Sequence, residues 1–108
     1  MVTYKVRLTP RARVDLTKIV EYVRKKESAT TATKVRKGIM EAIKKLQKLP
    51  ESHAKVEELS DEQIVFRRML KWDYKIVFTV EKDELVVLVV KIYHGSQNPD
   101  AIIEELKK

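Results

Sequence analysis

The first residues of the chain alternate between apolar and basic side chains. In the segment TYKVRL, Tyr4, Val6 and Leu8 share one side, and Lys5 and Arg7 share the other. A period of two residues is typical of a strand that buries one face. The segment is therefore predicted to form a strand whose polar side is basic.

Two helical patterns follow this strand. The first begins with Thr9 as a candidate N-cap and Pro10 at the first helical position. Its apolar residues recur at helical spacing: Ala12, Leu16, Ile19, Val20 and Val23. The second has its own stripe and stops before Pro50: Val35, Ile39, Ala42, Ile43 and Leu46. The short connection between the two patterns predicts an antiparallel helical hairpin.

The second half of the chain contains three strand-like runs. Residues 51–63 are polar and are predicted to form a loop, and the runs IVFRRML, YKIVFTV and LVVLVVKIY follow. The last two are joined by a polar turn, which indicates an antiparallel meander. NPDAIIEELKK has the start signals of a short last helix. The prediction is one α+β domain over residues 1–108, in the order β-α-α-β-β-β, with the helical hairpin packed on one face of a curved, mostly antiparallel four-stranded sheet.

Side-chain alternation divides the strand residues between two faces. We expect these residues to point toward the helices: Tyr4, Val6, Ile76, Phe78, Val86, Leu88 and Val90. The opposite, open face then combines cations with apolar groups: Lys5, Arg7, Lys75, Val77, Val87, Val89, Lys91 and Tyr93. Arg67 joins this face, or Arg68 does if the register shifts by one residue. Such a mixed surface is suited to binding an acidic peptide with apolar anchors or an RNA strand, unless lysine side chains simply cover the valines. The residues predicted to bind a partner are Lys5, Arg7, Arg67, Arg68, Val77, Val87 and Val89.

The chain has a net charge of +7, and its excess of positive charge lies in the first half. Residues 1–50 contain 14 basic and 4 acidic residues, whereas residues 51–108 contain 9 and 12. This excess fits a polyanionic or acidic protein partner. The apolar runs are too short for a membrane span and the first residues do not resemble a secretion signal, so a cytoplasmic location is expected.

Few residues are available for cofactor or metal chemistry. The chain has no cysteine, and its two histidines, His53 and His94, make a weak metal site. Its two glycines, Gly38 and Gly95, cannot build a glycine-rich phosphate loop. We therefore expect no metal and no cofactor.

Several strings, in this order, resemble one family. They are YKVRLTPRARVDLTKIVEYV, then FRRML, then DYKIVFTVEKDELVVLVVKIYHGSQNP. Together they resemble the RelE/ParE superfamily of toxins from type II toxin-antitoxin systems. The resemblance implies a small basic toxin neutralised by an acidic-tailed antitoxin that is encoded beside it. A homodimer and a toxin-antitoxin heterotetramer are both compatible with this expectation.

The superfamily contains two functional branches. ParE-like members poison DNA gyrase, whereas RelE-like and YoeB-like members cleave mRNA on the ribosome. We place this chain first with the ParE-like branch, because its helical hairpin is long and basic and a His-Gly pair follows the last strand. A toxin retained only to bind antitoxin is a further alternative.

The ribonuclease branch requires a base, an acid and cations around the phosphate. The candidates are His94, Tyr93, Arg67, Lys75 and Lys91. By alternation, His94 lies on the other side of its strand from Lys91 and Tyr93. This set can therefore meet only if the strand ends or bulges there.

Overall fold

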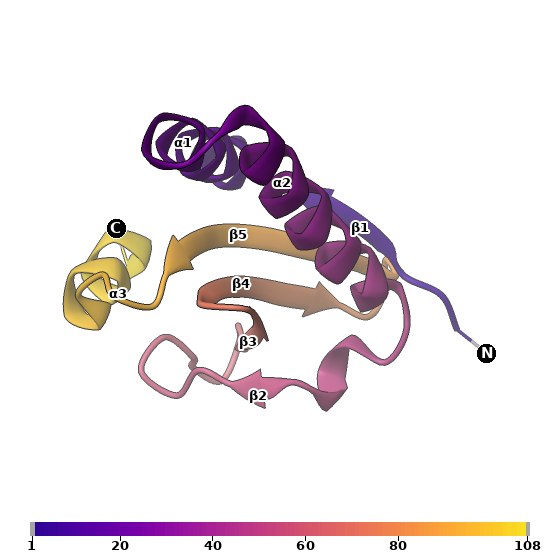
Figure 1. Cartoon of the computed structure of the whole chain (residues 1–108). Coiled ribbons are helices and arrows are strands. Elements are labelled where there is room, and N and C mark those ends of the chain that lie inside the picture. The colour runs from indigo at the N-terminus through magenta and orange to yellow at the C-terminus, as the bar shows by residue number, and fades with distance from the viewer. Residues whose placement is uncertain (1, 108) are drawn as a thin grey trace.

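The computed structural model describes residues 2–107 and contains a helical hairpin, a five-stranded sheet and a terminal helix (Figure 1). The elements in chain order are β1 (Lys5–Leu8), α1 (Pro10–Lys26), α2 (Ala29–Lys44), η1 (Lys45–Gln47), η2 (Pro50–Ser52), β2 (Ala54–Lys55), β3 (Phe66–Lys71), β4 (Tyr74–Glu81), β5 (Val86–His94) and α3 (Pro99–Lys107). The predicted α+β fold and element order are confirmed. The one additional strand is β2, two residues within the segment predicted to be a loop. None of the described helices is long and apolar enough to cross a membrane.

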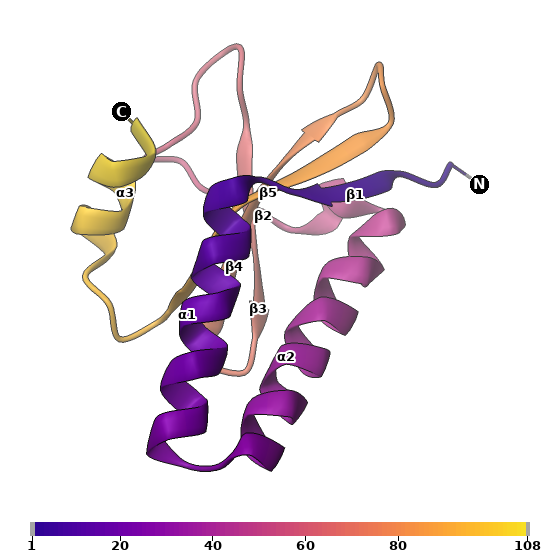
Figure 2. The same cartoon turned by 90° about the horizontal axis from the view of Figure 1, so that it is seen from above.

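Local hydrogen bonds define where the two long helices begin. The Thr9 side chain accepts a hydrogen bond from the Ala12 N–H at 3.1 Å, and Pro10 follows at the first position of α1. The Ser28 side chain accepts one from the Thr31 N–H at 3.0 Å. Because only two residues separate the helices, α2 returns beside α1, as Figure 2 shows. The predicted helical hairpin is confirmed.

The strands form one sheet in the order β1-β5-β4-β3-β2. β1 runs parallel to β5, and the other neighbouring pairs are antiparallel. The first strand therefore becomes an edge of the sheet. Its pairing with β5 ends where Leu8 is opposite Val89, and the remainder of β5 has no strand on that side.

The main core lies between the helical hairpin and one face of the sheet. Its members come from both helices and from β3, β4 and β5: Ala12, Leu16, Ile39, Ala42, Ile43, Leu46, Met69, Ile76, Phe78, Val87, Val89 and Ile92. Both helices contribute their predicted apolar stripes. Burial of these stripes provides the hydrophobic stabilisation that holds the hairpin on the sheet.

The single tryptophan packs the β3–β4 turn against the helical hairpin. Trp72 adopts a left-handed conformation with φ of 53°. Its ring packs so closely on α2 that a Cβ atom added at Gly38 would lie 2.2 Å from the ring atom Cη2. Gly38 is therefore required for close approach.

A β-bulge in β5 overturns part of the predicted division into faces. Val77 is opposite Lys91 and Phe78 is opposite Val89, so Val90 has no residue opposite it. Val87 and Val89 consequently point into the hairpin core and are fully buried. The prediction that they lie on the open face is wrong. A run that is apolar on both faces does not reveal which of its residues face the helices, and the bulge changes the alternation along the strand.

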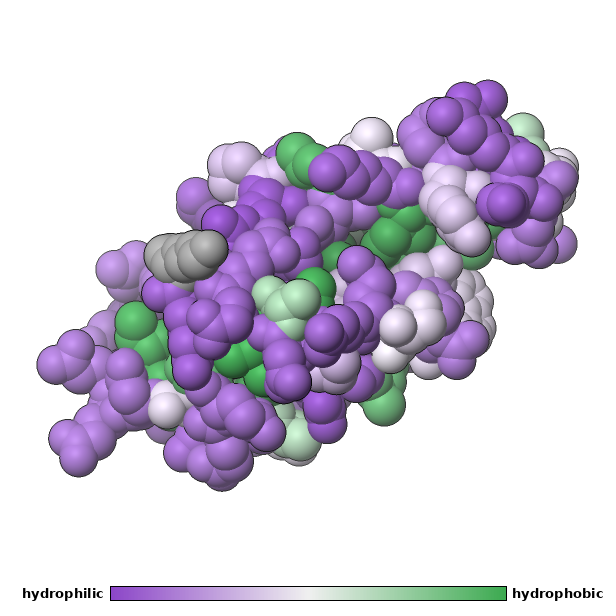
Figure 3. All heavy atoms as spheres, turned by 90° about the vertical axis from the view of Figure 1, so that its left-hand side faces the viewer, coloured by the Kyte–Doolittle hydropathy of each residue, from purple (hydrophilic) through white to green (hydrophobic). Residues whose placement is uncertain are grey.

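The opposite face is not open, because α3 and the loop before β3 cover part of it. A second cluster forms there from Val77, Tyr93 and Ile102, with Leu59, Phe66, Val90 and Leu106 packed against it. Val77 is 1% exposed and Tyr93 is 7% exposed. Figure 3, which views the molecule from the α3 end, shows a mainly hydrophilic surface with small separate hydrophobic areas. The prediction of an uncovered face that combines apolar and cationic residues is therefore wrong over this region.

Candidate functional site

Three of the predicted cationic and aromatic residues meet on the α3 side of the sheet. Lys75 is opposite Tyr93, and its Nζ lies 5.9 Å from the centroid of the Tyr93 ring. Arg68 of β3 is opposite Val77 of β4, which places the Arg68 side chain on this same face. The alternative register, with Arg68 rather than Arg67 on this face, is the one found. Burial raises the pKa of Tyr93, partly offset by Arg68, so the phenol stays protonated at neutral pH.

Lys91 is buried in an ion cluster rather than presented on a surface. Its Nζ lies 3.0 Å from Oδ1 of Asp15 on α1 and 3.1 Å from Oε1 of Glu105 on α3. The other Asp15 oxygen, Oδ2, accepts a hydrogen bond from the Ile92 N–H at 3.0 Å. Asp15 thus provides the hydrogen-bond acceptor for the edge of β5 beyond the end of β1. Lys91 connects α1, β5 and α3. The prediction that Lys91 lies on an open face is wrong.

The charge of Lys91 is maintained despite its burial. Removal from water disfavours the ammonium, but the hydrogen bonds and charges of Asp15 and Glu105 outweigh this effect and raise the pKa of Lys91. Lys91 therefore remains a cation with its donors engaged. Its role in this arrangement is to hold the C-terminal helix in place.

His94 lies on the hairpin side of the sheet. Its ring makes an edge contact with the ring of Tyr74, with centroids 5.4 Å apart. Its Nδ1 accepts a hydrogen bond from the Ser96 N–H at 3.0 Å and lies 2.7 Å from the Ser96 Oγ. The ring adjoins a hollow of about 530 Å³ to which Tyr22 and Trp72 also contribute. The bulge does not bring His94 to the side of Tyr93.

Arg67 lies on the hairpin side as well, away from His94. It is opposite Phe78, and its guanidinium donates a hydrogen bond to the His53 carbonyl oxygen at 2.9 Å. His53 makes an edge contact with Phe78 at 5.8 Å, and burial, together with the nearby charge of Arg67, lowers the pKa of His53. Arg67 thus supports the loop before β2.

The five candidate ribonuclease residues therefore do not converge. Tyr93 and Lys75 share one face, while Lys91 is enclosed in its ion cluster. His94 and Arg67 lie on the other face but far from each other. Their partners on β4 are Tyr74 and Phe78, which are four residues apart, or about 13 Å along a strand. In the described residues, no group of three or more His, Cys, Asp or Glu side chains could hold a metal ion.

The predicted partner-binding residues also do not form one surface. Arg67 and Arg68 are half-buried and lie on opposite faces of β3. Lys5 and Arg7 are exposed on the edge strand β1. Val77, Val87 and Val89 are buried, so they are not available to a partner in this arrangement. Among the predicted partner-binding residues, Lys5 and Arg7 at the β1 edge are therefore the most exposed.

Sequence reasoning did not identify Asp15 or Glu105. Asp15 is the only acidic residue in the first half of α1 and precedes Leu16 on the buried stripe. A single carboxylate beside a buried stripe is a signal for a buried ion pair, because such a charge needs a partner. Glu105 carries no comparable signal, because the α3 segment contains several acidic residues and none stands out.

Sequence comparison identifies the family of the chain. Residues 6–99 match the family model described as ParE toxin of type II toxin-antitoxin system, parDE. The chain belongs to this ParE toxin family. The predicted membership in the RelE/ParE superfamily of toxins is confirmed. Among curated protein sequences, none matches the chain.

Solved structures with the same fold include other toxins of this superfamily. The chromosomal ParDE system from P. aeruginosa superposes with a TM-score of 0.68 at 18% identity, covering 87% of this chain and 98% of that one. The archaeal RelE-RelB complex from Pyrococcus horikoshii OT3 gives 0.58 at 16% identity, over 89% and 99%. The toxin-antitoxin complex RelBE2 from Mycobacterium tuberculosis gives 0.57 at 21% identity, over 90% and 97%. At these identities the likeness shows that this ParE family member shares their fold.

Proposed function

We propose that this ParE family toxin arrests growth in the cytoplasm by binding DNA gyrase and trapping it while the DNA is broken, and that a cognate acidic-tailed antitoxin neutralises it. Such a mechanism depends on surface contacts and requires no catalytic residue. The match to the ParE family model supports this branch of the superfamily.

The observation that carries the proposal is the separation of the candidate catalytic residues. A ribonuclease needs its acid, base and phosphate-binding cations within reach of one phosphate. Here His94 and Tyr93 lie on opposite faces of the sheet, and Lys91 is held by two carboxylates. This distribution favours binding over chemistry.

An antitoxin partner is supported by two further observations. The similar structures include a ParDE system and the RelE-RelB and RelBE2 complexes. The first half of this chain also carries its excess of positive charge. An acidic partner segment would neutralise that charge and reduce the self-repulsion of the surface.

The experiment is to incubate the purified chain with DNA gyrase and relaxed plasmid, and separately with ribosomes translating a defined mRNA. We expect loss of supercoiling and accumulation of cleaved plasmid, with intact mRNA. His94→Ala should leave gyrase inhibition and growth arrest unchanged. Uninhibited gyrase together with codon-dependent cuts in the mRNA would overturn the proposal.

That second outcome would identify an mRNA interferase, the alternative function. One observation favours this alternative: Lys75 and Arg68 share a face with the Tyr93 ring. Tyr93→Phe separates the two functions, because it removes only the hydroxyl from a buried ring. Gyrase inhibition should survive this change, whereas mRNA cleavage that used the phenol should be lost.

A further inference from the structure

The hollow of about 530 Å³ beside His94 is lined by aromatic rings from separate elements. They are Tyr22 of α1, Trp72 of the β3–β4 turn, Tyr74 of β4 and His94 of β5, and we call this site the aromatic hollow. Tyr22 is 64% exposed and Trp72 is 57% exposed. Large rings that remain exposed beside a hollow are typical of recognition sites, because tyrosine and tryptophan are the residues that most often anchor a partner.

The backbone holds Trp72 at the aromatic hollow against its own conformational preference. β3 ends at Lys71 and β4 begins at Tyr74, so Trp72 and Asp73 form the two-residue connection of a hairpin. Such connections favour Asn-Gly or Asp-Gly, and a bulky residue with φ of 53° is strained. Close packing on Gly38 then fixes the ring. Strained residues of this kind cluster at functional sites, which indicates that the position of this ring has a use.

Two carboxylates line the aromatic hollow, Glu27 at the end of α1 and Asp73 after the tryptophan. Within residues 2–107, neither of them forms an ion pair. Burial raises the pKa of Tyr74, and the negative charges of Glu27 and Asp73 raise it further. Both carboxylates therefore act on the same phenol and leave their charge uncompensated there.

The positive charge at the aromatic hollow lies away from these carboxylates. Among the described residues that line it, Lys18 is the only lysine or arginine. Lys18 precedes Glu27 by nine residues, which is about 13.5 Å along a helix. The end of the hollow beside Tyr74 is therefore negative in a chain that is basic as a whole.

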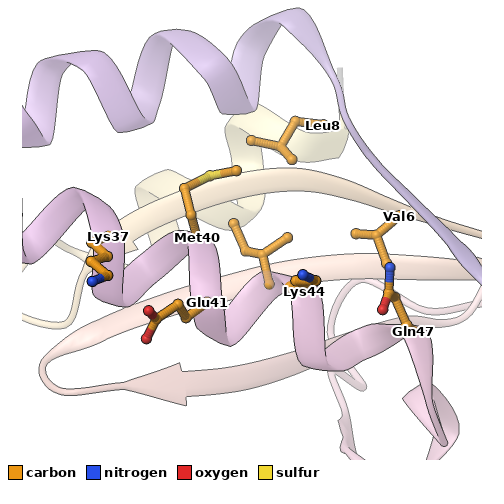
Figure 4. A pocket seen from close by; sticks show the side chains of 8 residues that line it. Val6, Leu8, Lys37, Met40, Glu41, Lys44 and Gln47 are labelled. Atoms are coloured by element: carbon orange, nitrogen blue, oxygen red, sulfur yellow. The ribbon is translucent and has the colours of Figure 1, made fainter.

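The groove between β1 and α2 has the opposite charge balance. It has a volume of about 390 Å³. Figure 4 shows Met40 extending from α2 toward Leu8, with Lys37, Glu41 and Lys44 along the helix. Two ammonium groups thus accompany one carboxylate, and none of the described residues that line this groove is aromatic. A cation is favoured at the aromatic hollow and disfavoured at this groove.

We propose that the aromatic hollow binds the guanidinium group of an arginine side chain presented by a protein partner. The planar cation stacks on the exposed rings of Tyr22 and Trp72. Its N–H groups donate to the carboxylates of Glu27 and Asp73, which an ammonium can match less well because it neither stacks nor forks. The Trp72 ring already attracts one cation of the chain, since Nζ of Lys71 lies 4.5 Å from its centroid, and Lys71 does not line the hollow. This inference goes beyond the proposed function and does not depend on the cellular target.

Titration with N-acetyl-L-arginine amide tests the proposal. Trp72 is the single tryptophan of the chain, so its fluorescence reports on the hollow directly. The blocked ends of the probe leave the guanidinium as its only charge, as in a protein. The matched probes are N-acetyl-L-citrulline amide, which is the neutral isostere, and N-acetyl-L-lysine amide. We expect a saturable change with the arginine probe, binding about tenfold weaker with the citrulline probe, and an intermediate affinity for the lysine probe.

Substitutions in the hollow separate the charges from the rings. Glu27→Gln combined with Asp73→Asn keeps the shape, removes both charges and should weaken binding of the arginine probe about tenfold. Glu21→Gln is the matched control, because it makes the same change on α1 at a residue that pairs with Arg24 outside the hollow, and it should bind like the wild type. Tyr22→Leu removes an exposed ring and should weaken binding about fivefold. Circular dichroism confirms that each variant is folded.

Backbone amide NMR of the full chain locates the bound probe. Chemical-shift changes at Tyr22, Asp73 and His94 would support the proposal, whereas changes concentrated at Lys37 and Lys44 would overturn it. Equal affinity for the arginine and citrulline probes would show that the hollow accepts uncharged planar groups, and would overturn it as well. The same conclusion would follow if the double variant bound the arginine probe like the wild type, or if no probe gave a saturable change up to its solubility limit.

Discussion

Asp15 provides the sharpest test of what holds the C-terminal half together. Its two carboxylate oxygens serve different partners: Oδ1 pairs with the Lys91 ammonium, and Oδ2 accepts the Ile92 N–H. Asp15→Asn removes the charge and keeps an oxygen for Ile92. Asp15→Ala removes both interactions. Comparison of these variants therefore separates the ion pair from the edge hydrogen bond.

The expected magnitudes follow from the burial of each partner. The side chains of Asp15 and Lys91 are 11% and 10% exposed, so water replaces little of what is lost. Breaking a buried pair costs about 3–5 kcal/mol, but Glu105 continues to pair with Lys91 and is 43% exposed. We expect about 1.5 kcal/mol of destabilisation for Asp15→Asn. Asp15→Ala should lose about 3 kcal/mol, because a charge-assisted hydrogen bond contributes about 1.5–3 kcal/mol.

Urea unfolding followed by circular dichroism measures these differences. With an m-value of about 1.5 kcal/mol/M, Asp15→Ala should lower the urea midpoint Cm by about 2 M. Glu21→Ala is the control on the same helix: it removes an exposed pair with Arg24 and should leave Cm unchanged. An Asp15→Ala midpoint equal to that of Asp15→Asn would refute the edge hydrogen bond, and wild-type midpoints for both would refute the whole cluster.

Three other predictions concern packing, pH and capping. Gly38→Ala should displace the Trp72 ring and shift its fluorescence emission to longer wavelength, since the new Cβ would overlap the ring; an unchanged spectrum would contradict this contact. The free energy of unfolding should fall above pH 10, because folding raises the pKa of Tyr93 above 10.0 and that of Lys91 above 10.5. The stability that these two groups contribute is complete below their unfolded-state pKa values and is lost as the pH rises through their folded-state pKa values. Unfolding midpoints across pH 8–12 test it. Ser28→Ala should cost about 1 kcal/mol in urea unfolding by removing the cap of α2.

The helices and most strands could be predicted because their signals are local. Thr9 followed by Pro10 marks the start of α1 within two residues, and each apolar stripe identifies the face that is buried. β2 could not be predicted, since Ala54 and Lys55 carry no alternation. It exists only because β3 offers a neighbouring edge, through pairs with Arg68 and Arg67.

The faces of β5 could not be predicted from its sequence. Its residues are apolar on both sides because the hairpin covers one face and α3 covers the other, so alternation carries no information about direction. The bulge at Val90 then places Val89 and Ile92 on the same side of the sheet. Only the register with β4 reveals this, and register is a tertiary property.

The edge of β1 and the part of β5 beyond Val89 lie on the same side of the sheet and differ in how their backbone groups are satisfied. Beyond Val89, the edge of β5 is closed by the Asp15 carboxylate, which accepts the Ile92 N–H. Along β1, no side chain within residues 2–107 hydrogen-bonds to the outward backbone groups of Val6 and Leu8. The chain thus satisfies one edge internally and leaves the adjacent one open beside a groove.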